Sequence, residues 1–399
     1  MIVGVVGKAN VGKSTFFKAA TLAEVEIANY PFATIKPNSG VGYVKVDDAA
    51  QQFGKVSNPR EGFVLGKKRF VPVQLIDVAG LVPGAHEGKG MGNQFLDDLR
   101  QADVLIHVVD IAGTTNEKGE SIDPGSYDPA NDVKFLEEEL DFWYAGILKK
   151  GWDKFAREVQ QTHKEVHKAL GKQLSGLGVT EKMVENLIKE NELDPKGVTN
   201  WNEDDLFKLA QKLRKMTKPM IIACNKIDVK GAIDNFKRVK EQFKEHLFIP
   251  CSAESELALR EAAKHGLIDY IPGTDDFSIK EESKLNEKQK KALLFIKEDI
   301  LKNYNSTGVQ EVLDKAVFDI LKYVTIFPGG VNKLEDKDGN VLPDCFLMKP
   351  GTTALDFAYR LHTDFGDKFI RAINVKTKMP IGKDHELNSG DVVEIIADR

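Results

Sequence analysis

An eight-residue motif near the amino terminus has the composition of a phosphate-binding loop. Residues 7 to 14 read GKANVGKS and fit the pattern GxxxxGK[ST]. Glycines let the backbone turn so that successive N–H groups face phosphate oxygens, and the amino end of a following helix adds a favourable dipole. In this pattern Lys13 reaches the β- and γ-phosphates, and the Ser14 hydroxyl ligates Mg²⁺. The residues predicted to contact the phosphates are Gly7, Ala9, Asn10, Val11, Gly12, Lys13, Ser14 and Thr15.

The context of this motif argues against coincidence. A chance match in a Gly-rich turn is expected in roughly a few chains per hundred. Here the motif follows the apolar run Ile2 to Val6 and precedes helical spacing from Thr15 to Leu22. A strand, a glycine-rich turn and a helix in that order are what phosphate binding requires.

A second motif, DVAG, spans residues 77 to 80 and ends the apolar segment VQLID. An acidic residue at this position can hold Mg²⁺ through a water molecule, and a glycine N–H can contact the γ-phosphate. The pattern DxxG is weak by itself because surface turns often contain it. Its position after a strand supports a metal role for Asp77 and a catalytic role for Gly80.

A third motif, NKID, follows the apolar segment MIIAC and supplies Asn225, Lys226 and Asp228. Guanine presents two donors along one edge, N1–H and the exocyclic amine, and one carboxylate can accept both. Adenine lacks that pair and would leave the Asp228 carboxylate desolvated and unpaired, at a cost of about 1–3 kcal/mol or more. Considered alone, NKID could be a helix-capping turn, but after a strand and a phosphate-binding loop it favours GTP over ATP.

Two further segments complete the predicted site. The sequence Cys251-Ser252-Ala253 is a loop of small residues suited to closing over the base, through Ser252 and Ala253. Between the first two motifs, residues 30 to 34 read YPFAT. Thr34 could complete the magnesium shell and take part in catalysis when a γ-phosphate is present, which is how such a loop becomes a switch.

The elements that position these motifs are predicted from the spacing of apolar residues. Runs rich in Val and Ile indicate buried strands at Ile2 to Val6, Val73 to Ile76, Val104 to Val109 and Met220 to Ala223. Helical stretches such as Asn93 to Arg100 lie between them. This alternation predicts an α/β fold, a P-loop NTPase with a mostly parallel sheet whose ligands bind at the carboxyl ends of the strands.

Between about residues 131 and 218 long polar segments with helical spacing follow one another, and they predict a helical insertion in the sheet domain. The expected helices are Val133 to Leu148, Lys154 to Leu170 and Glu203 to Met216. Helical spacing returns at Asn286 to Lys302 and at Val309 to Tyr323, which predicts a helical connection.

The last 75 residues or so predict a small β-grasp module. Expected strands at Asn340 to Leu347, Lys368 to Val375 and Asp391 to Ile396 surround a helix from Thr353 to His362. Thr353 is a good N-cap for that helix, and Asp356 stands in its first turn.

Composition limits the class of protein. The chain has 399 residues, 42% hydrophobic and 29% charged, with a net charge of -5, as in ordinary globular proteins. No run of 18 apolar residues occurs, the start has no signal-peptide pattern, and three cysteines fit neither zinc nor disulfide spacing. We expect a cytoplasmic protein of two or three domains with no membrane contact.

Charge is unevenly distributed along the helical region. Residues 113 to 144 carry 9 acidic and 2 basic side chains, whereas residues 145 to 218 carry 15 basic and 11 acidic ones. This contrast could form a binding surface, but solvated helix faces explain it more simply. From Thr325 onward there are 10 basic and 12 acidic residues, which favours recognition of shape or protein over neutralisation of phosphates.

The motifs taken in order resemble a known family. GKANVGKS, NYPFAT, DVAGLVPGAHEGKGMGNQFL, NKID and CSA are similar to those of an Obg-family GTPase of the translation-factor class. The Gly-rich stretch from Gly80 to Phe95 and the helical insertion resemble the YchF/Ola subfamily. KPGTTALDFAYRLH and LNSGDVVEI resemble a TGS domain, the β-grasp module shared with threonyl-tRNA synthetases and stringent-response enzymes.

This resemblance covers nearly the whole chain and implies an organisation and a function. It implies an OBG-type G domain at 1–275, interrupted at about 131–218, a helical connection at 276–322 and a TGS domain at 323–399. It implies a GTP-hydrolysing, Mg²⁺-dependent switch that contacts ribosomes or RNA through the TGS and helical domains. Several subfamily members carry Glu in place of the Asp in NKID and prefer ATP, so an ATPase is the alternative. A second alternative is a TGS-mediated binding module in which hydrolysis is secondary.

The residue that orients the attacking water stays open. Many GTPases have glutamine directly after DxxG, but here Leu81 follows and cannot orient water, so slow intrinsic turnover is expected. Asn10 occupies the position where related GTPases use asparagine to hold K⁺, and it could equally be a residue that tolerates a tight turn. His86 could approach the phosphates, although a loop histidine is more often solvated.

Three other histidines have simpler explanations. His107, inside the apolar run VLIHVVD, is expected to be a core residue hydrogen-bonded to a neighbour. His163 and His167 would lie one helical turn apart like a zinc pair. Without a third ligand they are expected to lie on a solvated helix face.

Overall fold

The computed structural model describes residues 1–22, 38–78 and 98–398. The chain forms two compact units: Met1–Ser14 with Ile76–Cys251, and Thr15–Leu75 with Ser252–Arg399. They are called unit 1 and unit 2 below, and each is described separately. The predictions for Thr34, Gly80, Leu81 and His86 fall on residues outside the described ranges.

A parallel sheet forms the centre of unit 1. Its strands lie in the order β1 (Ile2–Val6), β5 (Val104–Asp110), β6 (Met220–Asn225) and β7 (Leu247–Pro250), and every pairing among them is parallel. All residues of β5 and β6 are buried, because a parallel strand covered on both faces needs an almost continuous apolar sequence. The predicted parallel sheet and three of its strands are confirmed.

The predicted nucleotide motifs follow the carboxyl ends of these strands. The phosphate-binding loop follows β1, NKID begins with Asn225 at the end of β6, and Cys251 follows β7. The helix α8 (Ala232–Gln242) connects β6 to β7. Because parallel strands end at the same edge of a sheet, these loops meet there.

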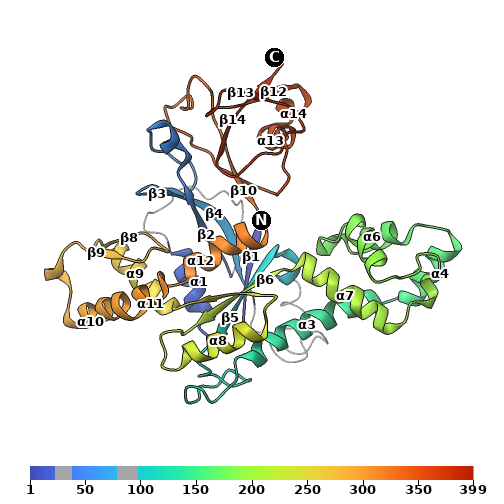
Figure 1. The fold of residues 1–399 in the computed structure, drawn as a ribbon, viewed down its shortest axis with the longest axis horizontal. Coiled ribbons are helices and arrows are strands. Elements are labelled where there is room, and N and C mark those ends of the chain that lie inside the picture. Colours follow the sequence, from blue (N-terminus) through green and yellow to red (C-terminus); the bar gives the residue numbers. More distant parts are fainter. Residues whose placement is uncertain (23–37, 79–97, 399) are drawn as a thin grey trace. The chain divides into compact units, whose positions relative to one another are not determined.

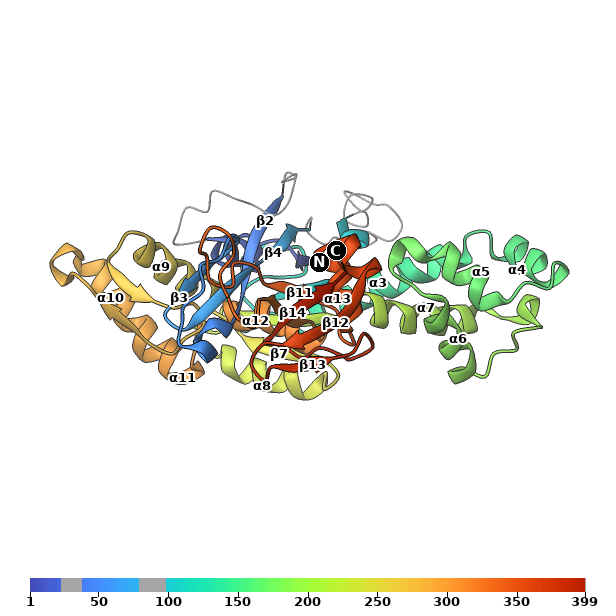
Figure 2. The same ribbon diagram turned by 90° about the horizontal axis from the view of Figure 1, so that it is seen from above.

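The helical insertion of unit 1 begins with α3 (Ala130–Lys149) and ends with α7 (Glu203–Thr217), and the two helices lie side by side (Figure 1). The elements that separate α3 and α7 in the sequence lie at the end of these two helices that points away from the parallel sheet of unit 1 (Figure 2). They are α4 (Trp152–Gln161), α5 (Val166–Gln173), η3 (Ser175–Leu177), α6 (Glu181–Glu190) and η4 (Val198–Asn200).

One predicted helix of the insertion was wrong. The segment Lys154 to Leu170 forms two helices, because α4 ends at Gln161 and α5 begins at Val166. His163 between them has a φ of 51°, a left-handed conformation that ends an α-helix. The helix α6, which Thr180 caps through Met183 N–H, was not predicted.

Unit 2 contains the strands that follow the phosphate-binding helix. These are β2 (Ser39–Asp47), β3 (Phe63–Leu65) and β4 (Lys68–Asp77), with β3 antiparallel to β4 and β2 beside β4. The helix α1 (Lys13–Thr21) and the last two residues of β4 pass from one unit to the other along the chain. The short 3₁₀ helix η1 (Ala49–Phe53) follows β2.

The middle of unit 2 is mostly helical, as predicted for the connection. The two predicted helices are interrupted by π-helical turns at Ile296–Leu301 and Ala316–Ile320. The other elements are α9 (Ala253–Lys264), β8 (Ile268–Tyr270), β9 (Phe277–Ile279), η5 (Glu282–Lys284), α10 (Glu287–Phe295), α11 (Lys302–Tyr304) and α12 (Val309–Lys315).

The carboxyl-terminal module is a five-stranded sheet with the order β11-β10-β14-β12-β13 and the helix α13 (Ala354–Leu361) packed against it. Thr353 and Asp356 form a reciprocal capping box, so the predicted N-cap is confirmed. The remaining elements are β10 (Val324–Pro328), β11 (Phe346–Met348), α14 (Thr363–Asp367), β12 (Phe369–Asn374), β13 (Met379–Ile381) and β14 (Asp391–Ala397).

Two details of this module differ from the prediction. The expected strand from Asn340 to Leu347 is reduced to Phe346–Met348, because Asp336 to Asn340 form a tight turn closed by Asp336 N–H to Asn340 O. The strand β10 was not predicted, and α14 is a second helix. Within the described ranges, no helix combines the length and apolar character that crossing a bilayer requires.

Candidate nucleotide-binding site

The phosphate-binding loop turns sharply between β1 and α1. Asn10 has a φ of 62° and Gly12 a φ of 89°, both in the left-handed region. A Cβ atom on Gly12 would lie 2.2 Å from Asn225 Nδ2, so only glycine fits. The first and third motifs therefore approach each other too closely for any larger residue at position 12.

Lys13 and Asp77 are brought together as the sequence predicts. The Lys13 ammonium forms an ion pair and hydrogen bond with Asp77 Oδ1. Ser14 is exposed, and its hydroxyl has no partner among the residues that the structure describes. A cation, a carboxylate and a free hydroxyl at the start of a helix form a polar group suited to phosphate and a hard metal ion.

The NKID motif is hydrogen-bonded directly to the phosphate-binding loop. The buried Asn225 side chain donates from Nδ2 to Val11 O at 2.8 Å. Lys226 Nζ donates to Asn10 O at 3.0 Å and to Asp110 Oδ2 at 2.9 Å. Residues more than 200 positions apart in the sequence are thus fixed in one place.

Asp228, the predicted base-reading residue, is exposed. Its carboxylate makes no hydrogen bond or ion pair with any residue in the described parts of the chain. Both oxygens are therefore available to accept hydrogen bonds from a ligand. This differs from Asn225 and Lys226, whose side chains are used to hold the loop.

The fourth motif contacts the third through its first residue. Cys251 N–H donates to Cys224 O at 2.8 Å, and Ile227 N–H donates to Cys251 O at 3.1 Å. Ser252 and Ala253 belong to unit 2, where Ser252 N–H donates to Thr307 O at 2.9 Å and its hydroxyl bonds Ser255 Oγ at 2.8 Å. The role of Ser252 and Ala253 at the base stays a prediction.

Sequence reasoning missed a set of residues that support the loop. Lys8 is buried, and its Nζ lies 2.9 Å from Asp132, 3.0 Å from Thr115 O and 3.9 Å from the centre of the Tyr127 ring. Burial raises the pKa of Asp132, and the hydrogen bond from Lys8 opposes that rise. Burial also raises the pKa of the Tyr127 hydroxyl, which donates to Asp132 at 3.0 Å.

The partners of Lys8 lie between β5 and the first turn of α3, in a segment without a recognised motif. Asn10 Nδ2 donates to Gly119 O at 2.8 Å in the same segment. The acid-rich composition after Gly113 and the lysine inside the loop were the available signals, but neither specifies the pairing. The φ of Asn10 agrees with a turn residue, while its role as a K⁺ ligand stays a prediction.

The predicted environments of His107, His163 and His167 are only partly confirmed. His107 is buried, and burial with the nearby charge of His246 lowers its pKa to about 3, so it is neutral. Its Nδ1 has no hydrogen-bond partner among the described residues, contrary to the expected bond. His163 is exposed but lies between two helices, so it is not one helical turn from His167 on a common face.

Comparison with known proteins matches three parts of the chain to family models. A "50S ribosome-binding GTPase" model matches residues 2–138. An "Obg-like GTPase YGR210-like, G4 motif-containing domain" model matches residues 223–330. A "TGS domain" model matches residues 335–397.

Several relatives match this chain over nearly the whole length of both proteins. A GTP-binding protein of Methanocaldococcus jannaschii is 50% identical over 397 residues, which cover 99% of each chain. The ribosome-binding ATPase YchF of Mycoplasma genitalium is 30% identical, covering 92% of this chain and 86% of its own. The crystal structure of a GTP-binding protein from Pyrococcus horikoshii OT3 is 40% identical, with a TM-score of 0.80 and complete coverage of both chains.

Proposed function

The chain belongs to the YchF family of Obg-like GTPases, and from that premise we propose that it binds GTP with Mg²⁺ and hydrolyses it to GDP and phosphate. The observation that carries the proposal is the attachment of NKID to the phosphate-binding loop. Asn225 and Lys226 are fixed on Val11 and Asn10, while Asp228 remains exposed and unpaired among the described residues. Such an arrangement keeps one carboxylate free beside a phosphate site.

The residues present fit a magnesium ion. Mg²⁺ prefers hard oxygen ligands and binds through few protein groups, water and substrate phosphates. The exposed Ser14 hydroxyl would supply one direct ligand, Asp77 would supply a carboxylate for a metal-bound water, and Thr34 is proposed as the third group. When bound, Mg²⁺ neutralises charge on the β- and γ-phosphate oxygens.

The protein contributes to hydrolysis mainly by positioning. Lys13, which contacts Asp77, would donate to the β- and γ-oxygens, and Gly80 N–H would contact the γ-phosphate. Leu81 has no group that can orient water, so the intrinsic rate is expected to be slow. K⁺ at Asn10, His86, or a partner is proposed to supply the missing stabilisation.

Base selectivity is tested with four nucleotide ligands of the full chain: GTP, ITP, ATP and GDP. ITP lacks the exocyclic amine, so it loses one of the two hydrogen bonds to Asp228. We expect GTP to bind at least about 5-fold more tightly than ITP or ATP, since an unpaired buried polar group costs about 1–3 kcal/mol. In Asp228→Asn this preference should disappear, whereas in the exposed control Asp234→Asn it should persist.

Two results would count against the proposal. Equal or tighter binding of ATP by the wild-type chain would favour the second candidate, an ATPase like the relative of Mycoplasma genitalium. Rapid GTP turnover by Lys13→Ala, with affinity for GTP retained, would contradict the catalytic assignment.

We also propose that nucleotide state governs association with the ribosome in the cytoplasm. Support comes from the ribosome-binding name of the YchF relative and the match to the TGS model. The proposed contacts are the TGS domain at 323–399 and the helical insertion at about 131–218, with the G domain at 1–275 and the connection at 276–322. Ribosomes pelleted with GDP or a non-hydrolysable GTP analogue should retain different amounts of the chain; equal retention would contradict the switch.

A further inference from the structure

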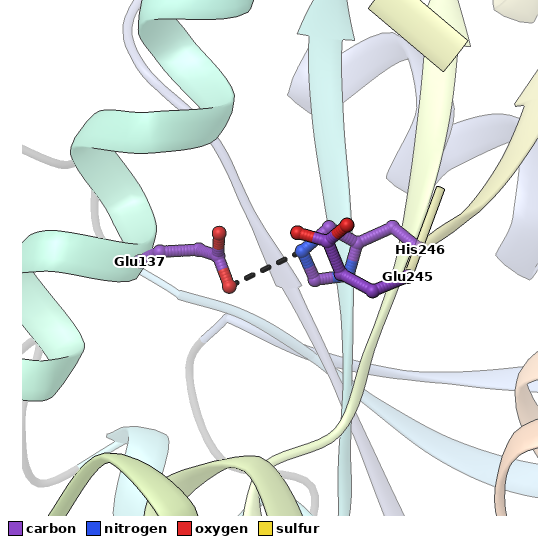
Figure 3. A group of neighbouring side chains, drawn as sticks. All are labelled: Glu137, Glu245 and His246. Atoms are coloured by element: carbon purple, nitrogen blue, oxygen red, sulfur yellow. Dashed lines mark ion pairs between the residues drawn. The ribbon is translucent and has the colours of Figure 1, made fainter. Parts of the chain in front are cut away.

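Three side chains from two elements of unit 1 gather away from the nucleotide motifs. Glu137 lies on α3, and Glu245 and His246 lie between α8 and β7. One potential metal-ligand atom of each lies within 4.8 Å of the others. Figure 3 shows Glu137 facing His246 from the helix, with the Glu245 carboxylate beside the imidazole. No other such group of three occurs within the described ranges.

The Nε2 atom of His246 is buried and lies close to the Glu137 carboxylate. The His246 side chain is only 9% exposed, and Nε2 lies 3.1 Å from Glu137 Oε1. At that distance Nε2 still has no well-directed hydrogen-bond partner among the described residues. An imidazole nitrogen and a carboxylate oxygen that lie close together without a well-directed hydrogen bond are compatible with two ligands of one ion.

The spacing agrees with this interpretation. Ligands at about 2.0–2.1 Å from a tetrahedral metal lie about 3.3 Å from one another. The separation of 3.1 Å between His246 Nε2 and Glu137 Oε1 is close to that value, and an oxygen of Glu245 lies within 4.8 Å of both atoms. Glu245 is exposed and has no partner among the described residues, so its carboxylate can turn toward the other two ligands without breaking a polar contact.

The charges and ligand types are suitable for a divalent ion. Arg214 Nη2 lies 3.2 Å from Glu137 Oε1 and orients this carboxylate. Two carboxylates and one guanidinium leave a net negative charge, and an imidazole ligand favours Zn²⁺ over Mg²⁺ or Ca²⁺.

We propose that Glu137, Glu245 and His246 form a binding site for a divalent transition-metal ion of the zinc class. The ion would connect the first helix of the insertion to the loop before β7, with water as its fourth ligand. This site is distinct from the magnesium position at Ser14 and Asp77, and it does not rest on the proposed GTPase activity.

The test uses the full chain stripped of metal by a chelator and kept free of nucleotide. Zn²⁺ binding is measured by calorimetry, and Co²⁺ is used as a spectroscopic probe because its visible absorption reports coordination. We expect about one Zn²⁺ per chain, a Co²⁺ spectrum typical of nitrogen and oxygen ligands, and a rise in thermal midpoint with Zn²⁺.

Substitutions at the proposed ligands and at control positions test which residues bind the ion. Glu245→Gln, a substitution at an exposed position outside the core, should weaken Zn²⁺ binding at least 10-fold and abolish the thermal shift. Glu138→Gln, the exposed neighbour on α3, should leave both unchanged. The proposal is overturned if wild type and Glu245→Gln bind Zn²⁺ alike, or if His167→Asn removes the ion instead. No Zn²⁺ binding at all would mean that the group is an ion pair only.

Discussion

Lys8 is a cation inside the phosphate-binding loop whose contacts lie within the protein. Its partners are the Asp132 carboxylate, Thr115 O and the face of Tyr127. The pair Lys8–Asp132 is almost fully buried, with 7% exposure for each side chain. Removing one partner of such a pair leaves an uncompensated charge in a poorly hydrated place.

Lys8→Met is therefore expected to destabilise the protein by about 3–5 kcal/mol, measured as a lower urea midpoint. Adding Asp132→Asn to Lys8→Met should restore part of this loss, since no charge then remains unpaired. The control is Lys18→Met, whose exposed pair with Glu261 should contribute about 0–1 kcal/mol. Equal effects of Lys8→Met and Lys18→Met would contradict this account.

The buried carboxyl group of Asp314 predicts that the stability of the fold depends on pH. Burial raises its pKa to about 7, although Lys45 N–H and Gln310 Nε2 donate to its Oδ1. Its unfolded pKa is about 3.9. The folded state therefore holds a proton that the unfolded state has released between these values, and stability falls as pH rises through that interval.

Between about pH 5 and about pH 8 the wild type should lose about 2 kcal/mol more stability than Asp314→Asn. Asparagine keeps the accepting oxygen but does not titrate, so the difference isolates the proton. Asp319→Asn, on an exposed carboxylate that pairs with Lys315, serves as the control. Parallel pH profiles for wild type and Asp314→Asn would refute the prediction.

At the scale of elements, one arginine joins the two long helices of the insertion. Arg214 on α7 is 2% exposed and donates from Nε to Asp141 at 2.7 Å and from Nη2 to Glu137 at 3.2 Å, both on α3. Gln211 adds a donor to Asp141 at 2.8 Å. The Arg214 guanidinium on α7 therefore balances the negative charge of two carboxylates on α3.

Arg214→Met should loosen both helices, because it leaves two carboxylates without their cation. We expect hydrogen exchange to become at least about 10-fold faster in α3 and α7 while β5 stays protected. Arg157→Met, at an exposed position of α4, should change neither helix. Faster exchange in β5 to the same degree would indicate global destabilisation instead.

The long elements were predictable because each carries its own periodic signal. β5 and β6 are mostly apolar runs, as fully buried strands require, and α7 has apolar residues at helical spacing. The capping box formed by Thr353 and Asp356 indicates the start of α13. The break at His163 was not predictable, since a left-handed histidine leaves no mark in apolar spacing. β10 (Val324–Pro328) was missed because it begins directly after the helical spacing that ends at Tyr323, and no glycine, proline or other turn residue separates the two.

The candidate site shows the same difference between features that the local sequence indicates and features that it does not. Lys13, Asp77 and Asn225 could be proposed from the sequence because each stands in a short motif whose residue types are fixed by the chemistry of phosphate, metal or base binding. Lys8 and Asp132 are 124 residues apart, and nothing in either local sequence indicates the other. Such a contact exists only through the fold, so sequence patterns cannot reveal it.

At the scale of the whole molecule, the net charge of -5 bears on how the chain would bind ribosomes. The carboxyl-terminal residues from Thr325 carry 10 basic and 12 acidic groups, too balanced for strong neutralisation of phosphates. We therefore expect a shallow salt dependence of ribosome association, with a log–log slope of magnitude below about 2. Co-sedimentation over a range of KCl concentrations measures this slope, and a value near 6 or more would indicate many phosphate contacts.

The length of α3 has a mechanical consequence. Its 20 residues extend about 30 Å, and its first turn carries Asp132, the partner of Lys8. A rigid rod of that length that tilts by about 5° at one end displaces its other end by about 2.6 Å. A small change in the backbone beside the phosphate-binding loop would thus become a movement of atomic size near Lys149, at the far end of the helix.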